Sequence, residues 1–179
     1  MRTIAAVLAA CLAAVPAFAQ APAAASSSPI TASITGQLGL IKGNLLKSAE
    51  QVPESLYGFK ATAEVRSFGQ LFAHVADANH MICSIIAGDK APTVSIEKTK
   101  TTKADISKAL EESFAYCEKV AGSLTDATGG ATVDLFGMKM AKTAALAFNV
   151  AHDFEHYGNV VTYMRLNKMV PPSSQGRGM

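Results

Sequence analysis

The sequence predicts an all-α protein, a four-helix bundle, on three observations. Four long segments repeat apolar residues at the three- and four-residue spacing of a helix. No segment shows a convincing strand alternation. Two long polar connections separate the second, third and fourth of these segments. Amphipathic helices of comparable length bury their apolar faces against one another, and long connections argue against simple up-down-up-down wiring.

Residues 1–19 precede the predicted fold and are typical of a secretory signal peptide. Arg2 supplies a positive start, Ile4 to Val15 is almost wholly apolar, and Ala17-Phe18-Ala19 is a cleavage signal. The apolar run is too short to span a bilayer comfortably. We therefore expect a periplasmic or secreted protein that has no membrane association once residues 1–19 are removed.

Residues 20–30, rich in Ala, Ser and Pro, are expected to form a flexible tether, and residues 175–179 are expected to form a disordered tail.

The charge of the remaining chain excludes some classes of partner. Without residues 1–19 the chain holds 15 Lys and Arg against 14 Asp and Glu. This balance offers no electrostatic footprint for nucleic acid or an anionic membrane. One domain is expected at 31–174, with a small molecule as its partner.

The first helix is expected from about Thr31 to Gln51, where Pro53 ends it. Three internal glycines weaken it by about 1 kcal/mol each relative to Ala. Either this helix depends on packing, or its glycines admit a close neighbour. The apolar stripe that would pack comprises Ile34, Leu38, Ile41 and Leu45.

The second helix is expected from the N-cap Ser67 to about Ala87, with Gly88 as its stop. A histidine, His74, occupies a position on its apolar face where a leucine would be ordinary. The inward residues of this helix are Leu71, His74, Val75, Ala78, Ile82 and Ile85.

The third and fourth helices follow the two long connections. Thr102 and Asp105 resemble a capping box, which places the third helix from there to about Leu124. The fourth is expected from about Met138 to Lys168, before two prolines. Its predicted inward residues are Ala145, Phe148, His152, His156, Asn159 and Tyr163.

Two cysteines remain outside the signal peptide, Cys83 and Cys117, and both fall in predicted helices among apolar neighbours. They are either two small buried hydrophobic side chains or the two halves of a single disulfide. The sequence leaves both alternatives open.

Three of the four histidines lie on predicted inward faces. His152 and His156 are four residues apart, so both rings point to one side of a helix. Burying these two rings together with His74 is costly unless each has a polar partner, and one shared cation satisfies all three. The pattern predicts a divalent metal site formed by three histidines. The alternatives are a hydrogen-bonded polar network without metal, or histidines that line an empty groove. His80 is expected at the surface or at the rim of the site.

The stretch HDFEH, residues 152–156, also fits the H-x-x-E-H pattern of one class of zinc peptidases. That class needs a further ligand downstream, but residues 157–179 contain no Asp, Glu, His or Cys. A di-iron bundle is disfavoured as well, because its E-x-x-H order is reversed here and the second helix has no Glu. The third ligand must come from upstream.

Two carboxylates are candidates for supporting roles. Glu155 shares one arc of the helix with His152 and His156, and it is the candidate catalytic base. The alternatives for it are a hydrogen-bond acceptor for a ligand N–H or a plain surface carboxylate. Asp77, one turn after His74, is expected either to orient that ring or to face solvent.

Among metals Zn fits the three-histidine site best, with Ni, Fe, Mn and Cu as alternatives.

Two segments resemble the DinB-like (YfiT-like) metalloenzyme family. VRSFGQLFAHVADANH, residues 65–80, resembles that family's second-helix motif, with His74 at its first histidine. NVAHDFEHYGNVVTYMRLNKMVPPSS, residues 149–174, resembles its fourth-helix motif, particularly in exported members, with His152 and His156 at the second and third histidines.

The resemblance implies an up-down-down-up bundle with one divalent metal on three histidines, and often a homodimer. Relatives of this family include metal-dependent thiol S-transferases, a thiol-dependent maleylpyruvate isomerase and hydrolases. The expected function is therefore that of an exported metal-dependent hydrolase or transferase acting on a small molecule. The alternative is a non-catalytic metal-binding or stress-related bundle.

Overall fold

The computed structural model describes residues 28–176. Four long helices make the body of the fold: α1 Pro29–Gln51, α2 Phe68–Ala87, α4 Lys103–Gly122 and α6 Lys142–Leu166. The predicted signal peptide, most of the tether and the end of the tail lie outside the described residues. No described helix is long and apolar enough to cross a membrane.

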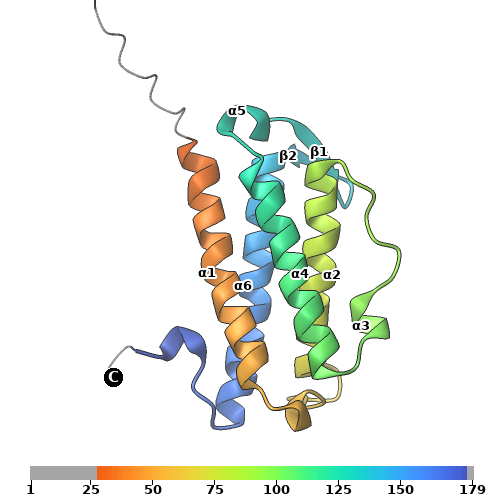
Figure 1. The fold of residues 1–179 in the computed structure, drawn as a ribbon, viewed down its shortest axis with the longest axis vertical. Coiled ribbons are helices and arrows are strands. Elements are labelled where there is room, and N and C mark those ends of the chain that lie inside the picture. Colours follow the sequence, from red (N-terminus) through yellow and green to blue (C-terminus); the bar gives the residue numbers. More distant parts are fainter. Residues whose placement is uncertain (1–27, 177–179) are drawn as a thin grey trace, which may run out of the picture.

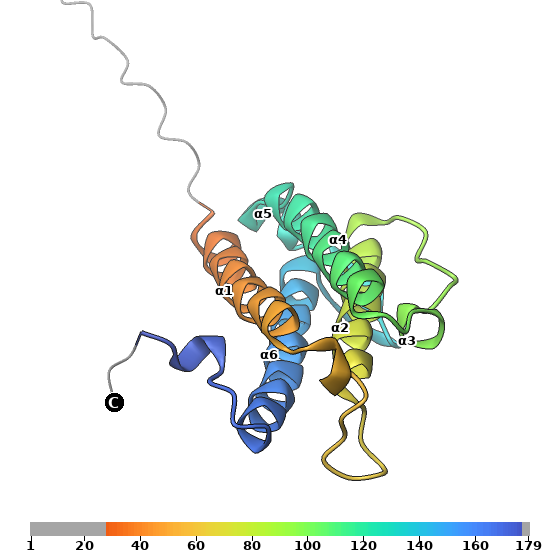
Figure 2. The same ribbon diagram turned by 60° about the horizontal axis from the view of Figure 1, so that its bottom comes forward.

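The four helices form a bundle with the expected up-down-down-up order. In Figure 1, α1 and α6 run downwards while α2 and α4 run upwards. Each helix packs against two others, because α1 and α2 each contact both α4 and α6. Figure 2 shows the same arrangement from below, with the short helix α3 Ile96–Thr99 on the outside beside α2 and α4. The parallel neighbours α2 and α4 require the long connection between them.

Caps predicted from the sequence set the ends of α2 and α4. The Ser67 hydroxyl accepts a hydrogen bond from the backbone N–H of Gln70, and Oε1 of Gln70 accepts one from the backbone N–H of Ser67, which completes a capping box. Gly88 ends α2 with φ of 83°, a left-handed conformation that glycine adopts without steric cost. The Thr102 side chain accepts from the backbone N–H of Asp105 at the start of α4.

The fourth helix begins at Lys142 rather than at Met138, because a β-hairpin precedes it. Strands β1 Thr132–Leu135 and β2 Met138–Ala141 pair antiparallel, with Leu135 opposite Met138. The two-residue turn has φ of 55° at Phe136 and 82° at Gly137. Positive φ at both central residues is what a type I′ hairpin turn requires. Strands of four residues are too short for alternation to stand out in a sequence, which is why none was expected.

Short elements complete the chain between the long ones. They are η1 Glu54–Leu56, α5 Asp126–Gly129 and η2 Pro172–Ser174. The largest fully buried side chains come from all four long helices and from β1: Leu38, Ile41, Leu45, Phe68, Phe72, Ile82, Ile86, Leu110, Phe114, Leu135, Leu146 and Met164.

The inward face of α6 differs from the expected one. Phe148 is 38% exposed and Asn159 is also exposed, whereas Asn149 and Asp153 are fully buried. The core face therefore lies about one residue further along the helix than the predicted stripe. His152 and His156 consequently stand at the edge of this face, toward α2, rather than at its centre.

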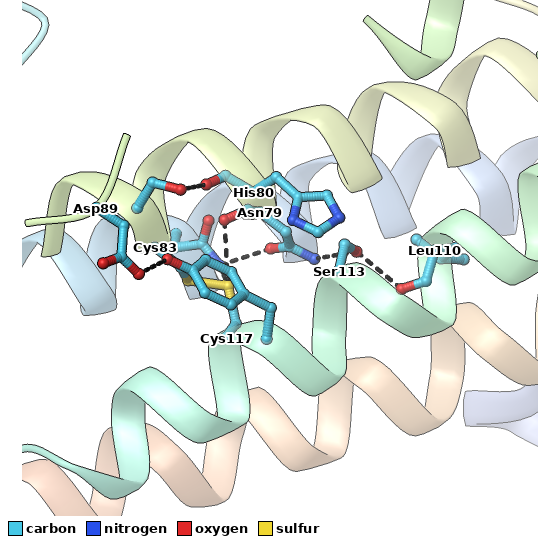
Figure 3. The surroundings of a disulfide bond; sticks show 10 residues. Asn79, His80, Cys83, Asp89, Leu110, Ser113 and Cys117 are labelled. Atoms are coloured by element: carbon cyan, nitrogen blue, oxygen red, sulfur yellow. Dashed lines mark hydrogen bonds between the residues drawn. A yellow bond between two sulfur atoms is a disulfide. The ribbon is translucent and has the colours of Figure 1, made fainter. Parts of the chain in front are cut away.

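A disulfide joins Cys83 of α2 to Cys117 of α4, with 5.4 Å between the Cα atoms. Figure 3 shows the bridge beside a buried polar cluster in which Asn79 donates to Ser113. Of the two alternatives left open by the sequence, the structure has the bridge. It ties together the two parallel helices that the long connection links.

Candidate metal centre

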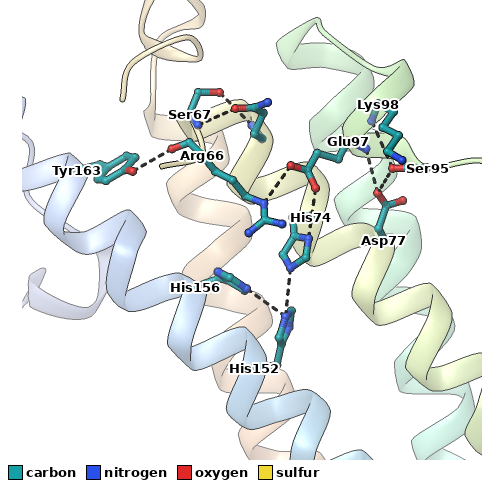
Figure 4. Close-up of polar contacts among 11 residues, drawn as sticks. Arg66, Ser67, His74, Asp77, Ser95, Glu97, Lys98, His152, His156 and Tyr163 are labelled. Atoms are coloured by element: carbon teal, nitrogen blue, oxygen red, sulfur yellow. Dashed lines mark hydrogen bonds and ion pairs between the residues drawn. The ribbon is translucent and has the colours of Figure 1, made fainter. Parts of the chain in front are cut away.

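The three predicted histidines meet between α2 and α6 (Figure 4). His152 and His156 lie on adjacent turns of α6, and His74 approaches from α2. The Nε2 atom of His152 lies 3.1 Å from Nε2 of His156 and 3.3 Å from Nε2 of His74. One ligand atom from each ring lies within 4.8 Å of the other two, so the group could hold a metal ion.

Two of the three separations have the length expected for two rings that share one ion. Zinc-to-nitrogen bonds are about 2.0–2.1 Å long, so two nitrogens at tetrahedral positions on one ion lie roughly 3.3 Å apart. The Nε2 separations of His152 from His156 and from His74, 3.1 and 3.3 Å, are of that size. The donor set suits the ion as well, since imidazole is a common ligand of Zn²⁺, Ni²⁺ and Fe²⁺.

Hydrogen bonds among the rings alone satisfy the cluster poorly. The Nδ1 atom of His74 lies 3.3 Å from a carboxylate oxygen of Glu97, so Nδ1 carries the proton and Nε2 is left as an acceptor. His152 must then donate from Nε2 to His74, and the same single hydrogen would have to serve His156 also. A cation shared by three lone pairs removes this conflict.

Burial keeps all three imidazoles neutral near pH 7. Loss of solvation is the largest cause that lowers the pKa of each ring, and the pKa of His152 falls to about 4. The positive charge of Arg66 lowers the pKa of all three rings further. Neutral rings are the form that binds a metal, because the lone pair of a protonated nitrogen is lost.

Residues 37–160 match the model of the DinB superfamily. The chain belongs to the DinB superfamily. The comparison with curated proteins gave no significant match.

Solved structures share the fold of this DinB-superfamily chain. A DinB-like protein from Bacillus cereus ATCC 10987 is 15% identical, with a TM-score of 0.69 over 78% of this chain and 93% of that one. A DinB-like protein from Bacillus subtilis is 18% identical, with a TM-score of 0.64 over 82% and 99%. A mycothiol-dependent maleylpyruvate isomerase is 16% identical, with a TM-score of 0.62 over 73% of this chain and 60% of that one. At these identities the likeness shows the fold alone.

Two residues of the candidate site, Arg66 and Glu97, were not found from the sequence. Glu97 of α3 places one carboxylate oxygen 3.3 Å from Nδ1 of His74 and accepts a hydrogen bond from Nε of Arg66 at 3.0 Å on the other. Both lie outside the long helices, where no apolar periodicity marks a position as inward. Arg66 precedes the cap of α2, and Glu97 lies in the polar connection after it.

Asp77 takes a role different from either alternative expected for it. It neither orients His74 directly nor simply faces solvent. Its carboxylate accepts hydrogen bonds from the Ser95 hydroxyl at 2.6 Å and from the backbone N–H groups of Ile96 and Glu97 at 2.6 and 3.0 Å. Asp77 thus binds the start of α3, the segment that carries Glu97.

Glu155 is exposed and lines a cavity of about 550 Å³ that His156, one of the three histidines, also lines. Its charge raises the pKa of His152 and His156, against the larger effect of burial. It makes no hydrogen bond with another of residues 28–176, so none of them holds it in place. The cavity is lined by Glu64, Val65, Arg66, Leu71, Glu97, Glu155, His156, Asn159 and Tyr163.

His80 lies apart from the three clustered histidines, as expected of a rim residue. Its ring stacks on Tyr116 of α4, with 5.8 Å between the centroids. It lines a second cavity of about 460 Å³, between α2 and the connection at 91–97, which His74 and Asp77 also border.

Proposed function

We propose that this DinB-superfamily protein is an exported hydrolase or transferase that binds one divalent metal ion and acts on a small molecule. The observation that carries the proposal is the convergence of three neutral Nε2 atoms, from His74, His152 and His156, on one point. Zn²⁺ is the first expectation, with Ni, Fe or Mn as alternatives.

The chemistry follows from the ligand set. An ion held by three neutral imidazoles keeps its double positive charge, and with an open position it lowers the pKa of bound water to about 7. Burial of the rings supports this set, because it disfavours their protonation at neutral pH. The chain itself would supply the ligands, the cavity wall and a base.

The adjoining cavity supports an enzyme over a metal carrier. Its volume of about 550 Å³ lies within the usual range of small-molecule sites. Polar side chains at its wall, including Arg66 and Asn159, could bind substrate, and Glu155 at the rim is the proposed general base. Transfer to or from a thiol is one candidate reaction, since the structural neighbours include a mycothiol-dependent isomerase.

Export and dimerisation complete the proposal. Export rests on the signal-like residues 1–19, and it would place the protein in the periplasm or outside the cell. A homodimer is proposed on the family resemblance described above. Because small thiols are mainly cytoplasmic, export favours hydrolysis over thiol transfer.

A second candidate is a non-catalytic metal-binding bundle. It is favoured by the freedom of Glu155, which is exposed and hydrogen-bonded to none of the other described residues. A general base is ordinarily held within reach of the proton it abstracts. Under this alternative the histidines store a metal or sense it.

The test starts from protein without residues 1–19, stripped of metal and reconstituted with Zn²⁺, Ni²⁺, Fe²⁺ or Mn²⁺. We expect about one ion per chain, lost in His152→Ala, and turnover of an ester, amide or thiol-transfer substrate only with metal. Binding of metal without any turnover would favour the second candidate. A sub-stoichiometric metal content that His152→Ala does not change would overturn both.

A further inference from the structure

Helix α3 reaches the metal centre from outside the bundle. It lies in the connection between α2 and α4, and in Figure 1 it stands beside the bundle rather than within it. Asp77 of α2 holds its start through three hydrogen bonds of 2.6, 2.6 and 3.0 Å (Figure 4). Hydrogen bonds to an ionised carboxylate are among the stronger ones in proteins.

Glu97, on this anchored helix, uses both carboxylate oxygens at the site. Oε1 accepts from Nε of Arg66 at 3.0 Å, and Oε2 lies 3.3 Å from Nδ1 of His74. The side chains of His74 and Glu97 are 24% and 22% exposed, so solvent screens their contact only in part. The bond to Arg66 fixes the plane of the carboxylate and keeps Oε2 directed at the ring.

His74 needs such support more than the other two histidines do. His152 and His156 share one helix and are placed by its geometry, whereas His74 comes alone from α2. The Nδ1 atoms of His152 and His156 are buried with no hydrogen-bond partner among residues 28–176. Within these residues, Glu97 is the one carboxylate that contacts an outward ring nitrogen of the cluster.

We propose that Glu97 and Asp77 are positioning residues of the metal centre. Glu97 holds His74 in the tautomer and orientation that direct Nε2 at the metal, and Asp77 acts through Glu97 by anchoring α3. The connection between α2 and α4 therefore contributes to the metal centre, because it carries Glu97. This inference rests on the proposed function, because it assumes that the three histidines bind an ion.

The test compares metal affinities of four variants with that of the wild type: Glu97→Gln, Glu97→Ala, Asp77→Ala and the double Asp77→Ala/Glu97→Ala. Affinity is measured by chelator competition with Zn²⁺, and ligand geometry by the visible spectrum of the Co²⁺ form. The matched control is Glu112→Gln, a surface carboxylate of α4 paired with Lys108.

We expect Glu97→Ala to weaken Zn²⁺ binding about 10- to 100-fold and to change the Co²⁺ spectrum, as loss of a carboxylate behind a ligating histidine typically does. Glu97→Gln should lose less, because its amide oxygen still accepts from Nδ1. Asp77→Ala should weaken binding, yet add little once Glu97 is already removed, since residues acting through one contact are not additive.

Three results would overturn the inference. One is a wild-type affinity and spectrum in Glu97→Ala. Another is an additive loss in the double variant, which would separate Asp77 from Glu97. The third is an affinity loss that merely tracks lower stability of the metal-free variants, measured by urea unfolding. If the wild type itself binds no metal, the proposed function fails instead.

Discussion

The Nε2 atoms of His74 and His152 lie 3.3 Å apart although 78 residues separate them in the chain. The contact exists because α2 and α6 are neighbours in the bundle, which brings the second and fourth long helices together. Nδ1 of the same His74 ring lies 3.3 Å from Glu97. One ring thus links the interior of the candidate site to the connection outside the bundle.

Replacing any one clustered histidine should abolish tight metal binding. His74→Ala, His152→Ala and His156→Ala each remove one of three converging nitrogens, so we expect a loss larger than the roughly 100-fold typical of supporting residues. Isothermal titration of the metal-free variants with Zn²⁺ measures this. His80→Ala is the matched control, because His80 is on α2 but stacks on Tyr116 instead. Equal losses in all four variants would contradict the assignment.

The three histidines could be predicted because the helical spacing of the apolar residues identifies any polar residue that shares their face. Glu97 could not, since a residue in a polar connection has no periodic neighbours to indicate where it points. The inward face of α6 was misplaced for a related reason. Asn149 and Asp153 are polar yet fully buried, while Phe148 is apolar and 38% exposed, so the pattern pointed to the wrong arc. The hairpin before α6 was missed because its strands are only four residues long.

Glu155→Gln should separate catalysis from metal binding. Removal of a general base typically costs about 10²- to 10⁴-fold in rate, whereas Glu155 lies at the rim and is not expected to bind the ion. We therefore expect kcat to fall by at least about 100-fold with a Zn²⁺ affinity close to that of the wild type. The surface variant Glu112→Gln serves as control. Unchanged kcat in Glu155→Gln would assign the base to another group.

The three clustered histidines should make the metal-free protein less stable as pH falls from about 6.5 toward 4. The pKa of His152 is near 6.5 in the unfolded chain and about 4 in the folded one, mainly because burial disfavours the charged ring. Between these values the unfolded state takes up a proton that the folded state does not, so the free energy of unfolding decreases. The depressed pKa values of His74 and His156 act in the same direction.

Urea unfolding at pH 7.5, 5.5 and 4.5 measures this pH dependence. The double variant His152→Ala/His156→Ala should show a shallower decrease, because two of the depressed groups are gone. Asp153 is present in both proteins, so its opposite contribution cancels in the comparison. An identical pH dependence in the double variant and the metal-free wild type would contradict neutral, buried rings.

Asp153→Asn should stabilise the protein at neutral pH. Asp153 is fully buried, both of its carboxylate oxygens lack a hydrogen-bond partner among the described residues, and burial raises its pKa well above 3.8. As pH rises above 3.8, the unfolded chain releases this proton while the folded chain keeps it, so stability is lost. Asn has a similar size and no charge to bury. The gain in urea midpoint should be seen at pH 7.5 and shrink toward pH 4, and a lower midpoint at pH 7.5 would show that the carboxyl is needed.

Reduction of the Cys83–Cys117 bridge should destabilise the bundle without disabling the metal centre. The two cysteines are 34 residues apart, and closing a loop of that size in the unfolded chain accounts for about 3–4 kcal/mol. We expect the urea midpoint of the wild type to fall on reduction. The urea midpoint of the double variant Cys83→Ala/Cys117→Ala should not change when the reductant is added. Cys83 lies more than two helical turns beyond His74 on α2. Zn²⁺ affinity of the folded, reduced protein should therefore stay near that of the oxidised form, and a large drop would mean that the bridge sets the spacing of α2 at the site.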